Sequence, residues 1–490
     1  MDSESDKTPS PRMTDVFSRR TALGTGIGAL AGMTIAGSRP AQAQPAVERL
    51  RDQLRRGLPI VVATDFPSVQ GAINSIPGGG IVFFPCREAP YVLPPMTVRA
   101  EGVQLVGDGA GDNRSELFWP SLGSAVAGIR VEAGGFAMHG LRLRGPRYQQ
   151  YLGRENLVDF PDDVFSTTNR ARHLTFSRCD FRETGGVGLH IAYGEDIDIT
   201  ECRFLDIGYA GAQLRSCDHG RFSRNTIKRI GPGGAQNNAY GVSLTHNSNG
   251  WPASESDRPF CSDWWISDNY IEDIPWEGID GHGGWRVYIS HNTIRNTKLG
   301  ISSAQSSGEA EEYAGGPNWI ESNYVYCDPG HARSNTGYGI NVSGGRDRRS
   351  LGSVVRNNHL EYKGSSGSSN AGAIMIGSCR TTIVHGNYID GIGTAGVAVR
   401  GAPGNATWQT GRVHITDNLF GDKAIGENGR SIFAVLARAN SDRTYFISNN
   451  HLFGLTRPLD GLVDRPVGVT TSIFSRSNYS DALGTLPESL

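Results

Sequence analysis

An apolar, strand-like segment followed by a turn returns about ten times along this chain, and this repeat restricts the possible folds more than any other feature. The shorter repeats follow one another at intervals of about 23 residues. Self-similarity at this period is typical of a solenoid, in which each repeat contacts its neighbours. The first halves of the repeats are 174–181, 197–204, 222–227, 266–271, 287–294, 320–325, 354–360, 383–389, 413–420 and 446–452.

One position of the aligned repeats is nearly always Asn. Asn side chains stacked along an axis can hydrogen-bond to one another, which predicts an internal ladder. The alternative is that each Asn serves its own turn, because Asn tolerates left-handed backbone; eight Asn in one register, with Cys at two further positions, favour the ladder. The residues at this position are Cys179, Cys202, Asn225, Asn269, Asn292, Asn323, Asn358, Asn387, Asn418 and Asn450.

The repeats consist of short strands with alternating apolar residues and Gly-rich corners. This pattern favours an all-β protein, a single-stranded parallel β-helix of about ten or more coils, over a propeller, whose repeats are nearly twice as long. Before the repeats, 47–58 and 69–73 are expected to form short helices of an N-terminal cap. From about residue 455 the repeat fades, so a C-terminal cap is expected to cover the last strand edges. The expected divisions are 44–110, 111–455 and 456–490.

The stretch before the repeats also carries a family resemblance. The run Gly78–Pro85 (GGGIVFFP), then Tyr91–Leu93, Met96–Val98 and Val103–Gly109, followed by the coils, resembles the pectate-lyase-like superfamily of β-helix proteins. The resemblance covers most of the chain after residue 43 and implies a right-handed parallel β-helix. It implies no single activity, because the superfamily includes polysaccharide lyases, glycoside hydrolases, epimerases and phage tail proteins.

The first 43 residues read as a twin-arginine signal peptide. Arg19 and Arg20 precede a weakly apolar, Gly-rich run, and Ala41-Gln42-Ala43 forms a small-residue cleavage pattern. A membrane anchor is the alternative, but the apolar run is shorter than the roughly 20 residues that span a bilayer. We therefore expect export by the Tat translocase to the periplasm or the exterior, with no stable membrane insertion after cleavage.

Charge and cysteine content argue against several classes of protein. The 47 basic and 49 acidic residues nearly balance, and no long charged block occurs, so nucleic acid is an unexpected partner. The cysteines lack a CxxC pair, which disfavours a zinc knuckle or a disulfide framework and leaves room for one or two bridges. The seven are Cys86, Cys179, Cys202, Cys217, Cys261, Cys327 and Cys379.

The Gly-led second strands of the repeats predict a polar column on the outer surface. Alternate strand residues point outward, so equivalent positions of successive coils align. The column is expected to contain His190, Gln213, Ser243, Asp280, Ser302 and Asn341, with Arg215, Thr245, His282 and Ser343 beside it. The insertions 246–261 and 305–317 are expected to wall a groove for a polysaccharide, and 146–169 is a further candidate lid, because long loops on rigid scaffolds often carry function.

Asp280-Gly281-His282 is the most distinctive motif of this column. The pair can be a base with its orienting carboxylate, two metal ligands, or a structural pair at a turn. Arg215 can form a surface salt bridge or clamp a uronate carboxylate in a bidentate fork. His190 can be structural or can transfer a proton.

Three functions fit these residues. In β-elimination or C5-epimerisation of a uronic-acid polymer, Arg215 neutralises the carboxylate, His282 acts as a base oriented by Asp280, and His190 or Tyr240 donates a proton. The expected substrate-binding residues are Gln213, Ser243, Tyr240, His246, Glu277, Asn341 and Trp251.

A glycoside hydrolase would instead pair Asp280 with a second carboxylate, which could be Glu277, Asp257, Asp263 or Glu309. The third possibility is a carbohydrate-binding or adhesive β-helix that performs no chemistry. The sequence requires no cofactor or metal, although acidic loops could hold Ca²⁺.

Overall fold

The chain divides into two compact units, Met1–Gln53 and Leu54–Leu490. The structure, a computed structural model, describes residues of the second unit alone. The described residues are 58–108, 113–122, 127–146, 156–231, 238–246, 261–282, 284–304, 316–327, 338–343, 352–362, 372–377, 379, 381–390, 395–400, 411–421, 433–438, 444–453, 463–464, 472–480 and 484–485. The predicted signal peptide and the helix expected at 47–58 therefore lie outside them, apart from Leu58.

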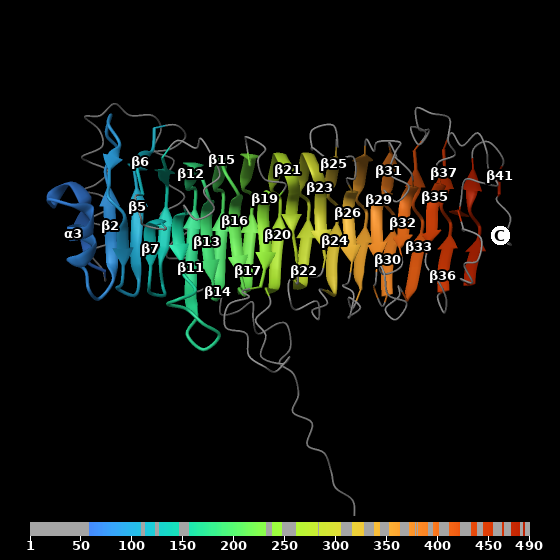
Figure 1. Ribbon diagram of the computed structural model, residues 1–490, viewed down its shortest axis with the longest axis horizontal. Coiled ribbons are helices and arrows are strands. Elements are labelled where there is room, and N and C mark those ends of the chain that lie inside the picture. Colours follow the sequence, from blue (N-terminus) through green and yellow to red (C-terminus); the bar gives the residue numbers. More distant parts are fainter. Residues whose placement is uncertain are drawn as a thin grey trace, which may run out of the picture. The chain divides into compact units, whose positions relative to one another are not determined.

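The described residues form a right-handed parallel β-helix, as predicted. Three ladders of parallel strands run along the axis, and every coil except the first and the last contributes one strand to each ladder. Figure 1 shows the strands stacked along this axis. Ladder 1 consists of β1 (Ile60–Val62), β2 (Gly80–Phe84), β5 (Val103–Gly107), β8 (Ala137–His139), β11 (Ala171–Ser177), β14 (Gly194–Thr200), β17 (Asp218–Ser223), β20 (Ser262–Ser267), β22 (Trp285–Ser290), β24 (Asn318–Glu321), β27 (Ser353–Arg356), β30 (Thr381–His385), β33 (Arg412–Thr416), β36 (Thr444–Ser448) and β39 (Ser472–Arg476).

Ladders 2 and 3 follow ladder 1 in each coil and join through two long strands, β21 (Tyr270–Asp280) and β23 (Thr293–Ser303), which belong to both. Ladder 2 adds β3 (Tyr91–Val92), β6 (Ser115–Phe118), β9 (Leu141–Arg144), β12 (Asp180–Thr184), β15 (Arg203–Ile207), β18 (Thr226–Ile230), β25 (Tyr324–Cys327), β28 (His359–Tyr362), β31 (Tyr388–Asp390), β34 (Leu419–Phe420), β37 (His451–Leu452) and β40 (Tyr479–Ser480). Ladder 3 adds β4 (Met96–Val98), β7 (Ala127–Val131), β10 (Asn156–Phe160), β13 (Val187–Ala192), β16 (Ala210–Arg215), β19 (Tyr240–Thr245), β26 (Tyr338–Ser343), β29 (Gly372–Gly377), β32 (Ala395–Arg400), β35 (Phe433–Arg438) and β38 (Val463–Asp464).

The core lies between the three ladders and is built by alternate strand residues. In ladder 3, Leu189, Ala212, Val242, Ile279 and Ile301 align in consecutive coils and are fully buried. Burial of an aliphatic side chain of this size contributes roughly 1.5–3 kcal/mol. Repetition of the same inward positions in each coil therefore stabilises a long stack whose coils are each too small to fold alone.

The predicted Asn ladder is present where ladder 1 turns into ladder 2. Each Asn side chain accepts from the Asn of the preceding coil and donates to the next, as Asn358 does with Asn323 and Asn387 at 3.0 Å each. Each of these amides also donates to a backbone carbonyl, such as that of Ile320 at 2.9 Å. Cys202 occupies the same position, because its backbone N–H donates to Asn225.

The left-handed backbone at this turn belongs to the residue before each ladder position. Arg224, Asp268, His291, Ser322 and Asn357 have φ between 55° and 59°. The turn explanation therefore fails for the ladder Asn residues themselves, because their side chains are buried and bonded along the axis.

The recurring Gly at the start of the ladder 3 strands marks a close approach between coils. A Cβ on Gly241 would lie 2.3 Å from the carbonyl oxygen of Gly278, and one on Gly211 would lie 2.6 Å from that of Gly241. Only glycine fits where one backbone lies this close to the next.

The N-terminal cap contains the second predicted helix. The helix α3 (Val69–Asn74) follows the short 3₁₀ helix η2 (Ala63–Asp65), and the Ser68 side chain caps α3 by accepting from Gly71 N. The segment buries Val69, Ala72 and Ile73 against the first coil.

The repeat continues one coil beyond the predicted boundary at residue 455. Strand β39 pairs in parallel with β36, and Asn478 extends the Asn ladder by accepting from Asn450 at 3.0 Å. Asn478 follows Asn450 by 28 residues, an interval within the range of 23 to 44 residues between other neighbouring Asn residues of the ladder. Strand β41 (Gly484–Thr485) then pairs antiparallel with β40, which ends the parallel series in the described residues.

Two further observations concern cysteines and helices. The described Cys86, Cys179, Cys202, Cys217 and Cys261 are free thiols rather than disulfides. Within the described ranges, no helix is both long and apolar enough to cross a membrane.

Candidate active site

The polar column predicted for the ladder 3 strands exists in the expected register. His190 pairs with Gln213, Gln213 with Ser243, Ser243 with Asp280, and Asp280 with Ser302, each in the adjacent coil. These residues alternate with core residues such as Leu189 and therefore point away from the core. They are nevertheless buried, with exposed fractions of 8% or less, so the column differs from an ordinary solvated surface.

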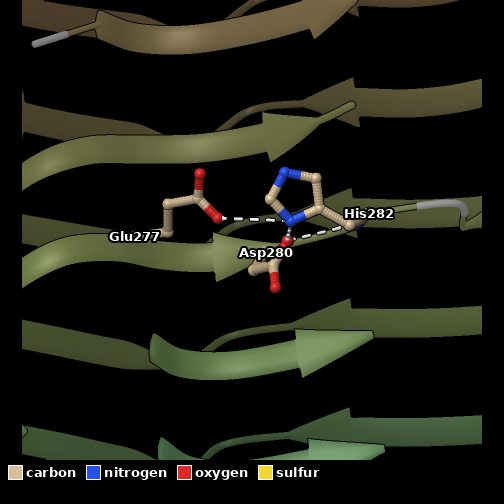
Figure 2. A group of neighbouring side chains, drawn as sticks. All are labelled: Glu277, Asp280 and His282. Carbon is tan, nitrogen blue, oxygen red and sulfur yellow. Dashed lines mark hydrogen bonds and ion pairs between the residues drawn. The ribbon is translucent and has the colours of Figure 1, made fainter. Parts of the chain in front are cut away.

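Glu277, Asp280 and His282 form a cluster at the end of β21. An oxygen of each carboxyl and a nitrogen of His282 lie within 4.8 Å of one another. His282 Nδ1 contacts Asp280 Oδ1 directly and lies 3.7 Å from Glu277 Oε2. Figure 2 shows both carboxyls converging on this nitrogen, while the other ring nitrogen points away from them.

The local backbone brings Glu277 onto the same side of the strand as Asp280, although the two are three residues apart. Gly278 faces the interior, because a Cβ there would meet Ile294 and the Gly300 carbonyl at 2.8 Å. Ile279 also faces the core, so the strand bends at this glycine rather than alternating strictly. A register shift between Ile274 and Glu277, typical of a β-bulge, precedes the bend. Bulges are common next to active sites because they re-aim side chains.

Hydrogen bonds hold the Asp280 carboxylate in place. Ser243 Oγ donates to Asp280 Oδ2 at 2.6 Å from the preceding coil, and the His282 backbone N–H donates to Oδ1 at 3.1 Å. Asp280 is 2% exposed. A buried carboxylate with three donors is rigidly oriented, and the His282 ring is one of those donors.

The two carboxyls have different electrostatic surroundings. Burial raises the pKa of Glu277 well above its ordinary value, and the negative charge of Asp280 raises it further, although His282 opposes the shift. Glu277 Oε2 is buried and has no hydrogen-bond partner among the described residues. Glu277 is therefore the carboxyl of the pair that favours the protonated form, which makes it a candidate proton donor.

The His282 imidazole favours its charged form. Burial alone would lower the pKa of His282, but the charges of Asp280 and Glu277 outweigh burial and raise it from 6.5 to about 10. At neutral pH the ring therefore carries a proton and a positive charge. This differs from the base role that the sequence suggested for His282.

Three side chains around Glu277 complete the cluster. Tyr240 precedes Glu277 in the coil stack, and burial raises the pKa of its phenol, so Tyr240 stays neutral. Lys298 Nζ lies 3.5 Å from the centre of the Trp276 ring, and burial lowers the pKa of Lys298 while the charge of Glu277 opposes this. Sequence reasoning missed Lys298. The only sequence signal was a Lys two residues before the Gly of a ladder 3 strand.

The structure separates His190 from this cluster and gives it a partner of its own. His190 Nδ1 lies 2.6 Å from Asp159 Oδ1, and Asn156 Nδ2 donates to the same oxygen at 3.1 Å. Asp159, which the sequence suggested as part of a lid, instead lies on β10, one coil before His190. His190 is three coils from Asp280, about 14 Å along the axis, so the two cannot act on one reacting atom.

Arg215 lies two coils before His282 and makes no recorded contact with the Glu277–Asp280–His282 cluster. Its Nε is buried and has no hydrogen-bond partner within the described part of the chain. Asn341, one coil beyond Ser302, donates to Ser302 and Ser343 at 3.5 and 3.4 Å. His246 directly follows β19. Trp251, Asp257 and Glu309 lie outside the described residues, as do 147–155, 247–260 and 305–315 of the three predicted loops.

The cluster also has the donor set of a metal site. Glu277, Asp280 and His282 each offer one ligand atom, and carboxylate oxygen with imidazole nitrogen suits transition metals better than Ca²⁺. The ion pair between His282 Nδ1 and Asp280, however, engages the histidine atom that would bind the metal. The arrangement fits proton transfer without rearrangement, whereas metal binding would have to displace this ion pair.

Comparisons with known proteins agree with the fold. Residues 164–326 match the family model described as a right-handed beta helix region. A PL6 family polysaccharide lyase from Pseudopedobacter saltans is similar in structure, with a TM-score of 0.51, 13% identity, and coverage of 87% of this chain and 94% of that chain. The catalytic domain of a GH87 alpha-1,3-glucanase in complex with tetrasaccharides has a TM-score of 0.52 and 11% identity, covering 86% of this chain and 69% of that chain.

No curated protein sequence is significantly similar to this chain. The two structural likenesses are too low in identity to carry an activity, so they concern the arrangement of the coils. Together with the three parallel ladders and the internal Asn stack, they lead to one conclusion. The chain is a right-handed parallel β-helix protein.

Proposed function

We propose that this protein is a polysaccharide-active enzyme that hydrolyses a glycosidic bond at the Glu277–Asp280–His282 cluster. The observation that carries the proposal is the pair of buried carboxyls in opposite surroundings. Glu277 favours its protonated form, whereas Asp280 accepts three charge-stabilising hydrogen bonds. Carboxyl pairs whose surroundings favour opposite protonation states supply the acid and the anion of glycoside hydrolysis.

Each residue then has a defined role. Glu277 donates its proton to the glycosidic oxygen as the bond from the anomeric carbon to that oxygen breaks. Asp280 stabilises the positive charge at the anomeric carbon and attacks it, and water later replaces Asp280 after losing a proton to Glu277. The spacing of under 4.8 Å between oxygens supports direct attack, because enzymes that use a water-mediated base need wider carboxyl separations. The protonated His282 orients Asp280.

The structural likenesses support a glycan substrate in general. The two similar structures are those of a polysaccharide lyase and of an alpha-1,3-glucanase. The sequence also predicts elimination or epimerisation of a uronic-acid polymer. Hydrolysis fits the site better, because the raised pKa of His282 favours its protonated form at neutral pH and Arg215 lies two coils away.

A second candidate, β-elimination, has one observation in its favour. The buried Arg215 Nε without a hydrogen-bond partner in the described ranges is a group that a substrate carboxylate would satisfy. In that reaction a base would remove the proton at C5 while the C4–O bond breaks, which leaves an unsaturated sugar. C5-epimerisation would share the proton abstraction and would return a proton to the opposite face.

The test is incubation of the purified protein with neutral and acidic polysaccharides, with new reducing ends and ultraviolet absorbance of unsaturated sugars both followed. Hydrolysis gives reducing ends without absorbance, whereas elimination gives both. Glu277→Gln should lower the rate of hydrolysis by about 10²–10⁴-fold, the usual contribution of a general acid. Glu272→Gln is the matched control, because Glu272 lies on the same strand but pairs with Lys228 away from the cluster.

The remaining outcomes discriminate among the alternatives. Unsaturated products that disappear in Arg215→Met would replace hydrolysis by elimination. Binding of the polymer with no cleavage product and with no change in the configuration at C5 of its sugars would favour a non-catalytic carbohydrate-binding protein. Equal rates for wild type and Glu277→Gln would remove Glu277 from the chemistry.

A further inference from the structure

Ladder 1 carries an apolar column on its outer face, away from the candidate active site on ladder 3. From β20 to β39, one outward position per strand is aromatic or aliphatic in almost every coil, and Figure 1 shows these strands following one another along the axis. We call this column the ladder 1 stripe; it includes Trp265, Tyr288, Trp319, Ile383, Phe446 and Phe474. Val354 and His414 continue it on β27 and β33.

The apolar side chains of the stripe are exposed at positions where polar side chains would be expected. Trp265 is 37% exposed, Ile383 38% and Phe474 57%, although polar residues usually cover the outward positions of a solvent-facing sheet. The same column is charged before β20, where Arg221 and Asp198 form an ion pair at 2.7 Å. The change from charged to apolar at Trp265 therefore distinguishes one half of the ladder from the other.

The rings of the stripe are ordered by their own stacking. The Trp265 and Tyr288 rings are nearly parallel at 6° with centroids 5.5 Å apart, and Tyr288 and Trp319 stack at 5° and 4.5 Å. Phe446 and Phe474 stack at 15° and 5.4 Å. Side chains held in place before binding lose little conformational entropy when a ligand arrives.

Polar side chains border the stripe on both sides. Two residues further along their strands, Ser267, Ser290, Thr416 and Ser448 place hydroxyls beside it, and Glu321 and Arg356 form an ion pair at the same position. On the other side, Arg286 and Asp263 neutralise each other in an ion pair. An apolar patch with a polar border is typical of an interaction surface, and hydroxyls with paired charges suit a ligand that has many hydroxyl groups.

The dimensions of the stripe select a linear ligand over a protein. Eight strands at about 4.8 Å spacing span about 34 Å, and the width between flanking positions on the same face is about 7 Å. The resulting area of about 240 Å² is far below the roughly 800 Å² per partner of a stable protein interface. A single polysaccharide chain is long and narrow, and its sugar rings combine apolar C–H faces with hydroxyl edges.

We propose that the ladder 1 stripe is a second, non-catalytic polysaccharide-binding surface that holds a neutral polymer along the helix axis. Its aromatic and aliphatic side chains contact the apolar faces of the sugars, and the bordering hydroxyls bind sugar hydroxyls. This binding function goes beyond the proposed hydrolysis, because the stripe holds the protein on an insoluble polymer while the reaction takes place on ladder 3. It also stands if the ladder 3 site catalyses a different reaction.

The experiment is co-sedimentation of the protein with insoluble cellulose, chitin and α-1,3-glucan. We expect the wild type to sediment with at least one of them, and Trp265→Ser/Trp319→Ser to lower binding by about tenfold, as truncation of aromatic anchor residues does. Phe474→Ser, at the most exposed position of the stripe, should weaken binding with no effect on folding. Val92→Ser is the control, since Val92 is 61% exposed on β3 of ladder 2.

Several results would overturn this proposal. The first is that the wild type sediments with none of the three polymers, and the second is that the wild type and both stripe variants bind equally. The third is that the wild type is a dimer and the stripe variants are monomers, while all of them still bind the polymer. Glu277→Gln should bind like the wild type, and the stripe variants should keep the wild-type rate on soluble oligosaccharides. A protein that binds through the stripe but cleaves nothing would sink the proposed hydrolysis alone.

Discussion

Ser243 donates a 2.6 Å hydrogen bond to Asp280, which lies beside it in the next coil of ladder 3. The bond joins two coils, and both residues are 2% exposed. It links the candidate active site to the repeat, because the same strand register that aligns the core also aligns this hydroxyl with the carboxylate. The first prediction follows from it.

Ser243→Ala should lower the hydrolysis rate by about 10–100-fold, because a hydrogen bond to a charged group contributes roughly 1.5–3 kcal/mol. Kinetics on the polysaccharide that gives reducing ends would measure this loss. Ser262→Ala is the matched control, since Ser262 donates to Asp218 at 2.8 Å on ladder 1. Similar losses in both variants would mean that the effect is on stability rather than on Asp280.

His282 should titrate far above an ordinary histidine. Its imidazole signals in NMR should shift with a midpoint near pH 10, and the midpoint should fall in Asp280→Asn because Asp280 is the larger of the two charges that raise the pKa. A histidine whose pKa rises on folding stabilises the protein fully below about pH 6.5 and loses that contribution as the pH rises through about 10. A wild-type midpoint near pH 6.5 would contradict the buried ion pair.

The thermal stability of His282→Gln provides a second view of the same linkage. The difference in melting temperature between wild type and His282→Gln should be largest below about pH 6.5 and should shrink steadily as the pH rises from there to about 10, because only the folded state still binds the imidazole proton in this range. A difference that grows toward alkaline pH would have the wrong sign for a raised pKa.

Asn358→Ala should lower the free energy of unfolding by about 2–4 kcal/mol, because it leaves the buried Ile320 carbonyl and the Asn323 N–H without partners. Chemical denaturation would measure the change. Thr381→Ala, at an exposed position of β30, is the control and should change stability by less than about 0.5 kcal/mol. A small effect at Asn358 would mean that water replaces the lost amide.

Gly241→Ala should destabilise the protein by about 1–3 kcal/mol, because the new Cβ would lie 2.3 Å from the Gly278 carbonyl oxygen. The displaced strand is β21, so the variant should also lose activity at the Glu277–Asp280–His282 cluster. Gly78→Ala is the control, since a Cβ there has no neighbour within 4 Å. If both variants unfold alike, the coils separate more easily than the structure indicates.

The strand register of ladder 3 was predictable because each coil repeats the sequence pattern of the coil before it. His190, Gln213, Ser243 and Asp280 align as the sequence pattern indicated. The last coil was not predicted, although Asn478 follows Asn450 by 28 residues and Phe474 pairs with Phe446 in the same register as in the preceding coils.

The partners within the site were harder to predict than its position. Glu277 was one of several carboxylates that could accompany Asp280, and its contact with His282 depends on the bend at Gly278 and the bulge before it. Asp159 pairs with His190 across an insertion whose length hides their adjacency in the sequence. Lys298 lies over the Trp276 ring, and the charge of Glu277 raises its pKa, although burial lowers it more; neither relation follows from the spacing of these residues along the chain.

The sequence by itself determined the repeat, the strand register and the identity of the residues in each column, because parallel coils place equivalent positions one above another. Only the tertiary structure decided which of those side chains are buried and charged together. Protonation of His282 and Glu277 depends on local burial and on charges a few ångströms away, and such distances arise from bends, bulges and neighbouring coils rather than from the spacing of residues along the chain.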